Sequence, residues 1–269
     1  MIAPADYFDL NQASPLARGL FEGLERVWEV LDRIKPFLEQ NIQPNIGPLK
    51  SRYPDFVPRT VILHQGRLIE DGFELKPGDV TKGRFQVFLG GEELKGAVVI
   101  YGGACLPDEA VELGPGVVIE PGAMIKGPTC IGPNSEVRQG AYIRGSCLVD
   151  SACIVGHVTE VKNSVFLHQA KAGHFAYVGD SVLGVGVNLG AGTKLANLKI
   201  KAGPTFFRLG ANIIQVDRRK FGAIIGDGCE LGCNTVTNPG CLLGPRTLVM
   251  PNSTIPSGIH QPHSIFLHR

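Results

Sequence analysis

The sequence predicts an all-β chain wound into a left-handed parallel β-helix, with a helical segment at its N-terminus. Three observations support this prediction: a six-residue aliphatic repeat, a high glycine content and a scarcity of aromatic residues. Glycine supplies 35 of the 269 residues and aromatic residues only 7%, whereas glycine averages about 7% of soluble proteins. Such a composition favours many tight turns around a core of small aliphatic side chains.

The repeat runs through the middle of the chain with one aliphatic residue at every sixth position: Leu113, Ile119, Ile125, Ile131, Val137, Ile143, Val149, Val155, Val161 and Leu167. A helix would need spacings of three and four residues, and an ordinary strand would alternate every two. A period of six is the hexapeptide pattern of a β-helix, in which three hexads form one coil. Successive coils then stack about 4.8 Å apart.

The repeat resumes after two interruptions, first at Leu183, Leu189 and Leu195, and then at Ile225, Leu231, Thr237, Leu243, Val249 and Ile255. The spacing from Leu167 to Leu183 falls two positions short of three hexads, so we expect a coil deformed around His174. The pattern is lost in residues 196–223, which predicts a long loop that leaves the column. Such loops commonly carry function.

The N-terminal region lacks the repeat and divides the chain into three parts. Residues 1–58 are expected to hold a helix and a proline-rich connector, because apolar residues from Leu16 to Ile34 have helical spacing and Pro36 ends the run. We expect this helix to cap one end of the column. Residues 59–101 contain strand-like runs that lead into the β-helix of residues 102–269, from which the loop 196–223 is inserted.

Charge and cysteine content exclude several classes of protein. Lys and Arg number 26 and Asp and Glu 25, whereas nucleic-acid binders usually carry a strong basic excess, so we expect no nucleic-acid partner. No apolar run reaches the length of about 18 residues that a membrane span needs, and the start of the chain has no signal-peptide pattern. The seven cysteines form no CxxC pair, which fits a cytoplasmic protein with reduced thiols.

Three basic residues are spaced by one coil. Lys126, Arg144 and Lys162 each follow a core position, and three hexads separate each from the next, so they should stack on one outer face. Like charges on adjacent strands are destabilising, which favours a bound phosphate at this ladder, since Arg suits bidentate recognition. The alternative is that solvent screens three splayed side chains.

His174 occupies the equivalent outward position on a different face. In a parallel trimer that face can approach the basic ladder of a neighbouring protomer, where an imidazole could serve as general base. The alternative is a structural histidine. The glycine-rich residues 184–192 lack the Gly-Lys-Ser/Thr ending of a P-loop, although an exposed backbone N–H there could stabilise an oxyanion.

Two further patterns concern ligands. The 196–223 loop sets six basic side chains against Asp217 alone, which predicts an anionic ligand unless the loop is merely solvated; the six are Lys199, Lys201, Arg208, Arg218, Arg219 and Lys220. Zinc enzymes of the γ-carbonic anhydrase type share this repeat. His168 and His174 are one hexad apart and should lie on adjacent faces, so a three-ligand zinc site is disfavoured and no metal is expected.

Residues 171–180 read Lys-Ala-Gly-His-Phe-Ala-Tyr-Val-Gly-Asp, and residues 186–193 read Gly-Val-Asn-Leu-Gly-Ala-Gly-Thr. These segments resemble the acetyltransferase domain of bacterial bifunctional UDP-N-acetylglucosamine synthesis enzymes, over roughly residues 110–250. The resemblance implies a homotrimeric left-handed β-helix that transfers acetyl from acetyl-CoA to glucosamine-1-phosphate or a related amino sugar phosphate.

The resemblance also assigns roles to individual residues. His174 matches the base that takes a proton from the sugar amine. Six positions match contacts to the substrate, with Lys220 supplied to a neighbour's site: Arg144, Lys162, Tyr177, Asn188, Asn197 and Lys220. Ala191 and Cys233 match positions beside acetyl-CoA.

The chain also departs from that family. Residues 1–100 lack the family's nucleotidyltransferase half with its glycine loop, so no coupling of UTP to a sugar phosphate is expected. Cys233 stands where the family usually has serine, and the loop between Asn197 and Lys220 is longer, which leaves the sugar open. The alternatives are a nucleotidyltransferase-related protein with a regulatory β-helix, a non-catalytic trimeric scaffold or sensor, and an enzyme like γ-carbonic anhydrase.

Overall fold

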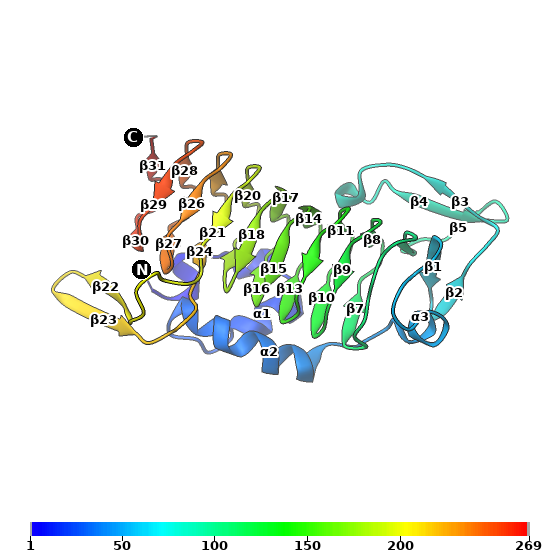
Figure 1. Cartoon of the computed structure of the whole chain (residues 1–269), viewed down its shortest axis with the longest axis horizontal. Coiled ribbons are helices and arrows are strands. Elements are labelled where there is room, and N and C mark those ends of the chain that lie inside the picture. The colour runs from blue at the N-terminus through cyan, green and yellow to red at the C-terminus, as the bar shows by residue number, and fades with distance from the viewer. Residues whose placement is uncertain (1, 268–269) are drawn as a thin grey trace.

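The computed structural model describes residues 2–267 and consists mainly of a three-sided column of stacked coils (Figure 1). Each face of the column is a sheet in which strands from successive coils lie side by side and run parallel. The predicted fold class, a parallel β-helix with an N-terminal helical segment, is therefore confirmed.

The three faces contain eleven, eight and seven strands. The 11-stranded sheet contains, in spatial order, β2 (Arg67–Ile69), β1 (Val61–His64), β6 (Val98–Ile100), β8 (Val118–Ile119), β11 (Glu136–Val137), β14 (Ile154–His157), β17 (Lys171–His174), β20 (Asn188–Leu189), β25 (Glu230–Leu231), β28 (Leu248–Val249) and β31 (Ile265–Phe266). This sheet also has an antiparallel end, where β1 pairs with β2 and with β6. The eight-stranded sheet contains β30 (Gly258–His260), β27 (Cys241–Leu243), β24 (Ala223–Ile225), β19 (Val182–Leu183), β16 (Ser164–Phe166), β13 (Cys147–Val149), β10 (Thr129–Ile131) and β7 (Val111–Leu113). The seven-stranded sheet contains β29 (Thr254–Ile255), β26 (Val236–Thr237), β21 (Lys194–Leu195), β18 (Tyr177–Gly179), β15 (Glu160–Lys162), β12 (Tyr142–Ile143) and β9 (Met124–Ile125).

The aliphatic repeat fills the interior of the column. The first nine predicted positions, from Leu113 to Val161, are buried in one hydrophobic cluster. The tenth is wrong by one residue: Phe166 faces the interior, and Leu167 packs outward against the N-terminal segment. The change arises because Val149 pairs with Phe166, so the coil that ends there is one residue shorter than the coil before it.

The deformation expected around His174 is also misplaced. Two successive coils each lack one residue, and both deletions fall at the corner that follows the seven-stranded sheet. Gly145 and Ser146 both adopt positive φ at this corner in the preceding coil, whereas Asn163 (φ 46°) and Asp180 (φ 48°) each turn the corner alone. The strand that carries His174 stays in register with its neighbour.

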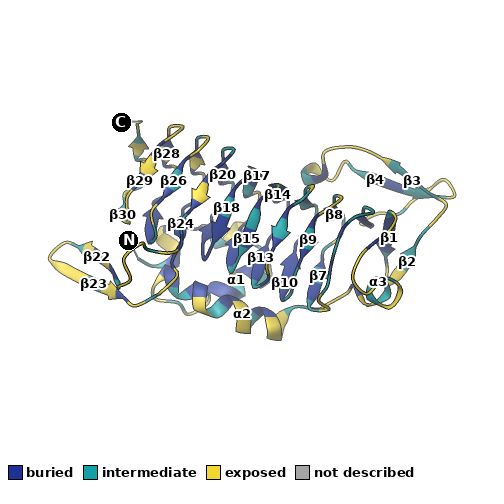
Figure 2. Cartoon of the chain, in the orientation of Figure 1, coloured by how far each residue is buried: buried dark blue, intermediate teal, exposed yellow. Residues whose placement is uncertain are grey.

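The N-terminal helices do not cap the column, contrary to the sequence prediction. α1 (Pro15–Phe21) and α2 (Val30–Asn41) lie along the outer face of the eight-stranded sheet (Figures 1 and 2). The helices pack on this face because its outward side chains are apolar. These side chains are Cys130, Leu148, Val165, Val182, Ile224 and Leu242. Pro36 lies inside α2 rather than ending it.

Shorter elements complete the N-terminal region. The end of the column is covered by α3 (Gly47–Arg52), whose Leu49 joins the interior cluster. A three-stranded sheet covers part of the 11-stranded sheet; it consists of β3 (Phe73–Lys76), β4 (Gln86–Leu89) and β5 (Glu92–Glu93). The 3₁₀ turns are η1 (Pro4–Asp6), η2 (Leu10–Gln12), η3 (Val27–Glu29) and η4 (Val80–Lys82). Within residues 2–267, no helix has both the length and the apolar character needed to cross a bilayer.

The inserted loop contains a hairpin, β22 (Thr205–Leu209) and β23 (Asn212–Val216), whose tip projects from the column (Figure 1). Its base packs on the N-terminal cover: the ring centroids of Trp28 and Phe207 lie 5.1 Å apart, and Phe207 meets Phe221 edge-on at 5.9 Å. Arg218 forms an ion pair with Asp32. The hairpin and the helices therefore share one hydrophobic cluster.

We expect Trp28→Ala to lower the free energy of unfolding by about 3–5 kcal/mol, because it opens a cavity between the helices and the hairpin. Chemical denaturation measures this change, and faster amide exchange in residues 205–216 should accompany it. The exposed Glu25→Ala in the same segment is the control, with an expected change within about 0.5 kcal/mol. Equal stability of the two variants would contradict this account of the cover.

Candidate functional site

The three residues of the basic ladder stack on one outer face, as predicted, and that face is the seven-stranded sheet. The amides of Lys126 and Arg144 donate to the carbonyls of Ile143 and Val161, which places Lys126, Arg144 and Lys162 on successive coils. Each cation has its own partner, however, so the ladder is not a row of uncompensated charges. Lys126 Nζ lies 5.7 Å from the centre of the Tyr142 ring.

The other two cations pair with carboxylates. Arg144 Nη1 donates to Glu160 Oε1 at 2.7 Å, and this hydrogen bond raises the pKa of Arg144. Lys162 Nζ lies 4.0 Å from Asp180 Oδ2. The Arg144 pair is half-exposed, whereas the side chain of Asp180 is only 5% exposed. Basic and acidic side chains are therefore paired along this face, and one of the acidic side chains, Asp180, is buried.

Asp180 organises the inner end of this set. Its Oδ2 accepts a 2.6 Å hydrogen bond from Asn197 Nδ2, and its Oδ1 accepts one of 3.0 Å from Asn163 Nδ2. Asn163 also donates to the carbonyl of Leu31 at 3.1 Å. One buried carboxylate thus connects Lys162, the start of the inserted loop and α2.

The two ends of the inserted loop meet beside Lys162. Leu198 and Lys220 form an isolated antiparallel bridge, and the Phe221 amide donates to the Asn197 carbonyl at 2.8 Å. Burial lowers the pKa of Lys162; Asp180 opposes this effect, and the charge of Lys220 lowers the pKa further. Five predicted substrate residues therefore lie together, and we call them the basic cluster: Arg144, Lys162, Tyr177, Asn197 and Lys220.

Tyr177 belongs to the basic cluster because it lies on β18 and pairs with Glu160 of the neighbouring strand β15. Its hydroxyl interacts with Asn197, and burial raises the pKa of Tyr177. The cluster thus offers cationic, hydroxyl and amide groups on one face, a combination that suits a phosphorylated, hydroxylated ligand.

The three remaining residues of the predicted reaction centre share one corner, where the 11-stranded sheet turns into the seven-stranded sheet. The Gly192 amide donates to the His174 carbonyl at 3.0 Å, and the Asn234 amide donates to the Ala191 carbonyl at 2.8 Å. His174, Ala191 and Cys233 therefore occupy equivalent positions in successive coils, and we call this column the histidine corner. His174 and Cys233 are exposed.

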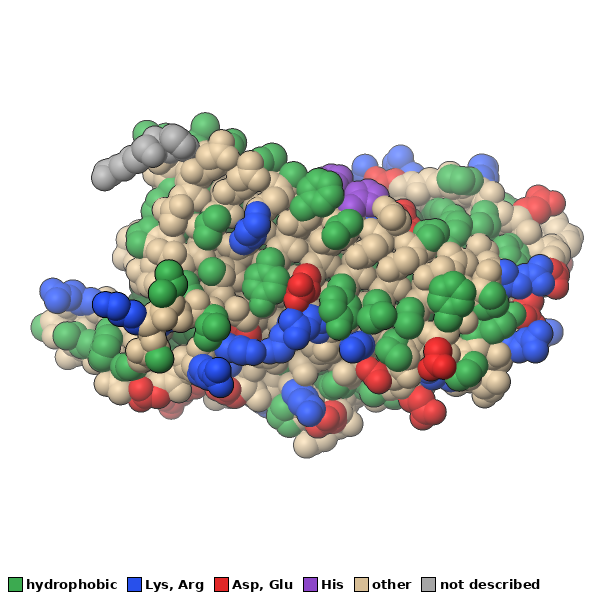
Figure 3. Space-filling view, viewed as in Figure 1, with side chains coloured by type: hydrophobic (Ala, Val, Ile, Leu, Met, Phe, Trp, Pro, Cys, Tyr) green, Lys and Arg blue, Asp and Glu red, His purple; other side chains and the backbone are tan. Residues whose placement is uncertain are grey.

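Asn188 is the predicted site residue that joins neither group within one chain. It lies on β20 in the 11-stranded sheet, is exposed, and donates from Nδ2 to Glu230 Oε2 at 3.0 Å. Figure 3 shows histidine side chains at the upper edge of the column and a mixed row of basic and acidic side chains lower on the same view.

Sequence reasoning missed Glu160, Asp180 and His157. Glu160 follows Tyr142 by three hexads, so the coil period could have placed it beside the ladder. Asp180 directly follows Gly179, the partner of Lys162 in the shortened coil, so the period alone does not place it. His157 directly precedes His174 in the histidine corner, but these paired residues lie one position closer in sequence than three hexads. Counting three hexads from His157 leads to Phe175, the residue after His174, and so misses the pairing.

Histidines and acidic residues do not gather into a metal centre in the described part of the chain: no three His, Cys, Asp or Glu side chains within residues 2–267 are placed to hold an ion. His168 lies apart from His174, on the turn that leads from the eight-stranded to the 11-stranded sheet. There its Nδ1 is 2.9 Å from Ser151 Oγ.

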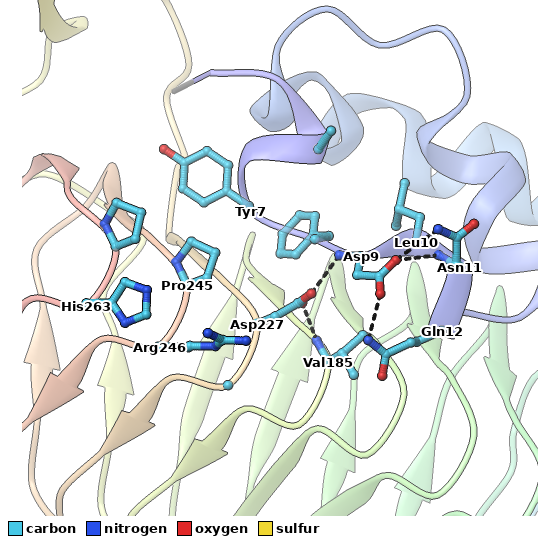
Figure 4. A pocket seen from close by; sticks show the side chains of 14 residues that line it. Tyr7, Asp9, Leu10, Asn11, Gln12, Val185, Asp227, Pro245, Arg246 and His263 are labelled. Carbon is cyan, nitrogen blue, oxygen red and sulfur yellow. Dashed lines mark hydrogen bonds between the residues drawn. The ribbon is translucent and has the colours of Figure 1, made fainter.

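A pocket of about 890 Å³ lies at another corner, where the N-terminal segment meets the last coils (Figure 4). Asp227 closes its floor by accepting the amides of Asp9 at 2.6 Å and Val185 at 2.7 Å, while Arg246 and His263 line the opposite side. None of the predicted site residues lines this pocket. Its polar floor joins the N-terminal segment to the column.

We expect Asp180→Ala to lower the free energy of unfolding by about 1–3 kcal/mol, because it removes the carboxylate that accepts from the Asn197 amide and one of the two acceptors of the Asn163 amide. The matched variant Glu160→Ala removes a half-exposed ion pair and should change stability by less than about 1 kcal/mol. Urea denaturation of both variants measures the difference. A larger effect for Glu160→Ala would refute the central place given to Asp180.

Comparisons with known proteins find one family and several curated proteins that are similar to part of this chain. The family described as "GMPPB C-terminal domain" matches residues 125–231. A bifunctional sugar-1-phosphate nucleotidylyltransferase/acetyltransferase of Sulfurisphaera tokodaii is 35% identical over 163 residues, which cover 61% of this chain and 37% of that protein. The bifunctional protein GlmU of Methanococcus maripaludis is 34% identical over 126 residues, which cover 47% of this chain and 30% of that protein.

Among solved structures, a mutant perosamine N-acetyltransferase from Caulobacter crescentus, in complex with CoA and GDP-perosamine, shares 17% identity. The match covers 62% of this chain and 51% of that one, with a TM-score of 0.26. This chain spans about a third of the length of the two curated relatives. The two curated relatives confirm the resemblance drawn from the sequence: over 47% and 61% of its length, the chain is similar to a bifunctional protein GlmU and to a bifunctional sugar-1-phosphate nucleotidylyltransferase/acetyltransferase.

Proposed function

We propose that this chain is an acetyl-CoA-dependent N-acetyltransferase whose acceptor is an amino sugar phosphate, glucosamine-1-phosphate or a close relative. The observation that carries the proposal is the pairing of two features on adjoining surfaces. The histidine corner presents an exposed imidazole, and the neighbouring face presents the basic cluster. The name of the S. tokodaii relative, which includes an acetyltransferase, supports the same reaction class.

In this reaction the sugar amine attacks the thioester carbonyl carbon of acetyl-CoA. A C–N bond forms, His174 accepts the amine proton, and the C–S bond then breaks to release CoA, which leaves as the thiol after regaining a proton. Transfer is direct, because no cysteine matches a catalytic position. Arg144, Lys162 and Lys220 hold the phosphate, and Tyr177 and Asn197 bind sugar hydroxyls.

The oxyanion of the tetrahedral intermediate would be stabilised by the Ala191 amide. The amides of Gly190 and Gly192 donate to the carbonyls of Leu231 and His174. Within residues 2–267 the Ala191 amide between them has no hydrogen-bond partner, and Ala191 is partly exposed. A fixed N–H group in the column that carries the base is suited to this task. Acetyl-CoA would then pass along the histidine corner beside Cys233.

The working assembly in this proposal is a homotrimer in the cytoplasm. Asn188 lies on the 11-stranded sheet and the basic cluster on the seven-stranded sheet. In this proposal, the faces of two neighbouring protomers bring them together. All seven cysteines are free, as expected in a reducing compartment.

A non-catalytic scaffold is the second candidate. One observation favours it: within the described residues, the His174 imidazole has no hydrogen-bond partner to orient it. Calorimetric titration with acetyl-CoA separates the two candidates, because a scaffold that has lost turnover has no need to bind the acetyl donor.

With glucosamine-1-phosphate as acceptor, we expect His174→Ala to reduce steady-state acetyl-CoA consumption by about 10²–10⁴-fold, the usual contribution of a general base. His263→Ala, at a different corner, should retain full activity. Activity undiminished in His174→Ala would remove the general-base assignment.

Alkylation of the native protein at pH 8 should modify Cys233, and saturating acetyl-CoA should slow that modification. Cys130, Cys147 and Cys229 should stay unmodified, because burial raises the pKa of each thiol to about 12 and the thiolate is the reactive form. Mass spectrometry of tryptic peptides reads out each site. Modification of Cys233 at the same rate with and without acetyl-CoA would contradict the proposed cofactor path.

A further inference from the structure

We infer that His157 is a positioning residue for His174: its ring stacks on the His174 imidazole and fixes the orientation in which that imidazole accepts a proton. This inference rests on the proposed function and adds a residue to it. The two ring centroids lie 5.4 Å apart, with an angle of 23° between the ring planes.

The backbone sets this stacking. His157 ends β14 and His174 ends β17, and the two residues are direct partners in the parallel ladder. The Phe175 amide donates to the His157 carbonyl at 2.8 Å, which locks the two corners together. Side chains at paired positions of adjacent strands lie close enough to interact.

Two rings of the described chain lie near the His174 imidazole. The Phe175 ring, in the same coil, is tilted by 46° at a centroid distance of 6.2 Å, whereas the His157 ring stacks on His174 from the neighbouring coil. Neither imidazole has a hydrogen-bond partner within residues 2–267, so the ring of His157 is the ordered contact that His174 makes with a neighbouring coil. On the other side, the following coil places Ala191 beside His174, and Asn188 of β20 pairs with Lys171 instead. Lys171 lies on β17 itself, and the ammonium of Lys194 on β21 donates to the Gly192 carbonyl at 2.7 Å.

The residues that follow both histidines support a functional role for this corner. Val158 (φ 49°) and Phe175 (φ 52°) adopt left-handed backbone conformations and are 59% and 61% exposed. The neighbouring coils use Gly140 and Gly192 at the equivalent positions. A β-branched residue with positive φ is strained, and such strain gathers at functional sites.

The stacking predicts how substitutions at His157 should behave. His157→Ala removes the ring and should lower kcat about tenfold, with KM for both substrates within about twofold, because a misplaced base slows chemistry more than binding. His157→Phe keeps a flat ring without a charge and should restore kcat to within about threefold of the native value. The control is Gln139→Ala. Gln139 is exposed and occupies the same corner one coil before His157, so this variant should have the kcat and KM of the native enzyme.

The comparison of kcat with KM separates this role from a purely structural one. A general structural defect would weaken substrate binding as well as kcat, and an aromatic ring at position 157 would not restore kcat. Unchanged kcat in His157→Ala, or equal losses of kcat in His157→Ala and His157→Phe, would overturn the inference.

A measurement without turnover keeps this inference distinct from the proposed function. In the full chain, the NMR signal of the His174 Cε1–H should move on His157→Ala, because the ring current of the stacked imidazole is lost, and should stay in place on Gln139→Ala. A signal that does not move on His157→Ala would overturn the inference. Absence of acetyl transfer by the native protein would instead reject the proposed function, and the NMR result would still decide on the stacking.

Discussion

The register of the parallel ladders is the constraint on which the rest of the molecule depends. Each strand hydrogen-bonds to the strands of the preceding and following coils, so one side chain per coil falls into the same column. This stacking places Arg144 beside Lys162 and His157 beside His174. A slip of one residue would exchange inward and outward side chains on a strand, so the buried aliphatic residues and the functional columns are fixed together.

The N-terminal cover is joined to the column by polar contacts as well as by apolar packing. Asp150 accepts the Ser14 amide at 2.9 Å, and Asp227 accepts the Asp9 amide. Asn163 donates both to the Leu31 carbonyl and to Asp180. The last contact connects α2 to the buried carboxylate beneath the basic cluster, so the cover and the candidate site share one hydrogen-bond network.

The periodic part of the structure could be predicted from the sequence, because a hexad needs only the order of aliphatic residues. That order determined the three faces, the interior positions up to Val161 and the ladder of Lys126, Arg144 and Lys162. The resemblance added residues that the structure gathers into the basic cluster and the histidine corner. Their roles in catalysis remain predictions.

The sequence predictions were wrong at the places where tertiary packing determines the structure. The one-residue deletions at Asn163 and Asp180 are cheap at a corner, because short polar residues tolerate left-handed φ, and no local pattern marks them. The helices lie on the eight-stranded sheet because its outward side chains are apolar, a pattern that the hexad count ignores. The pairing of His157 with His174 could not be predicted either, because it depends on the one-residue deletion at Asn163.

The hairpin insertion has a consequence for how this architecture can vary. Val182 pairs with Ile224 and Leu183 with Ile225 as directly as if the intervening residues were missing. A coil can therefore admit a hairpin-sized excursion at a corner without disturbing the register of the coils on either side. Evolution can lengthen, shorten or replace such an excursion as an independent module, while the geometry of the remaining surface is inherited unchanged.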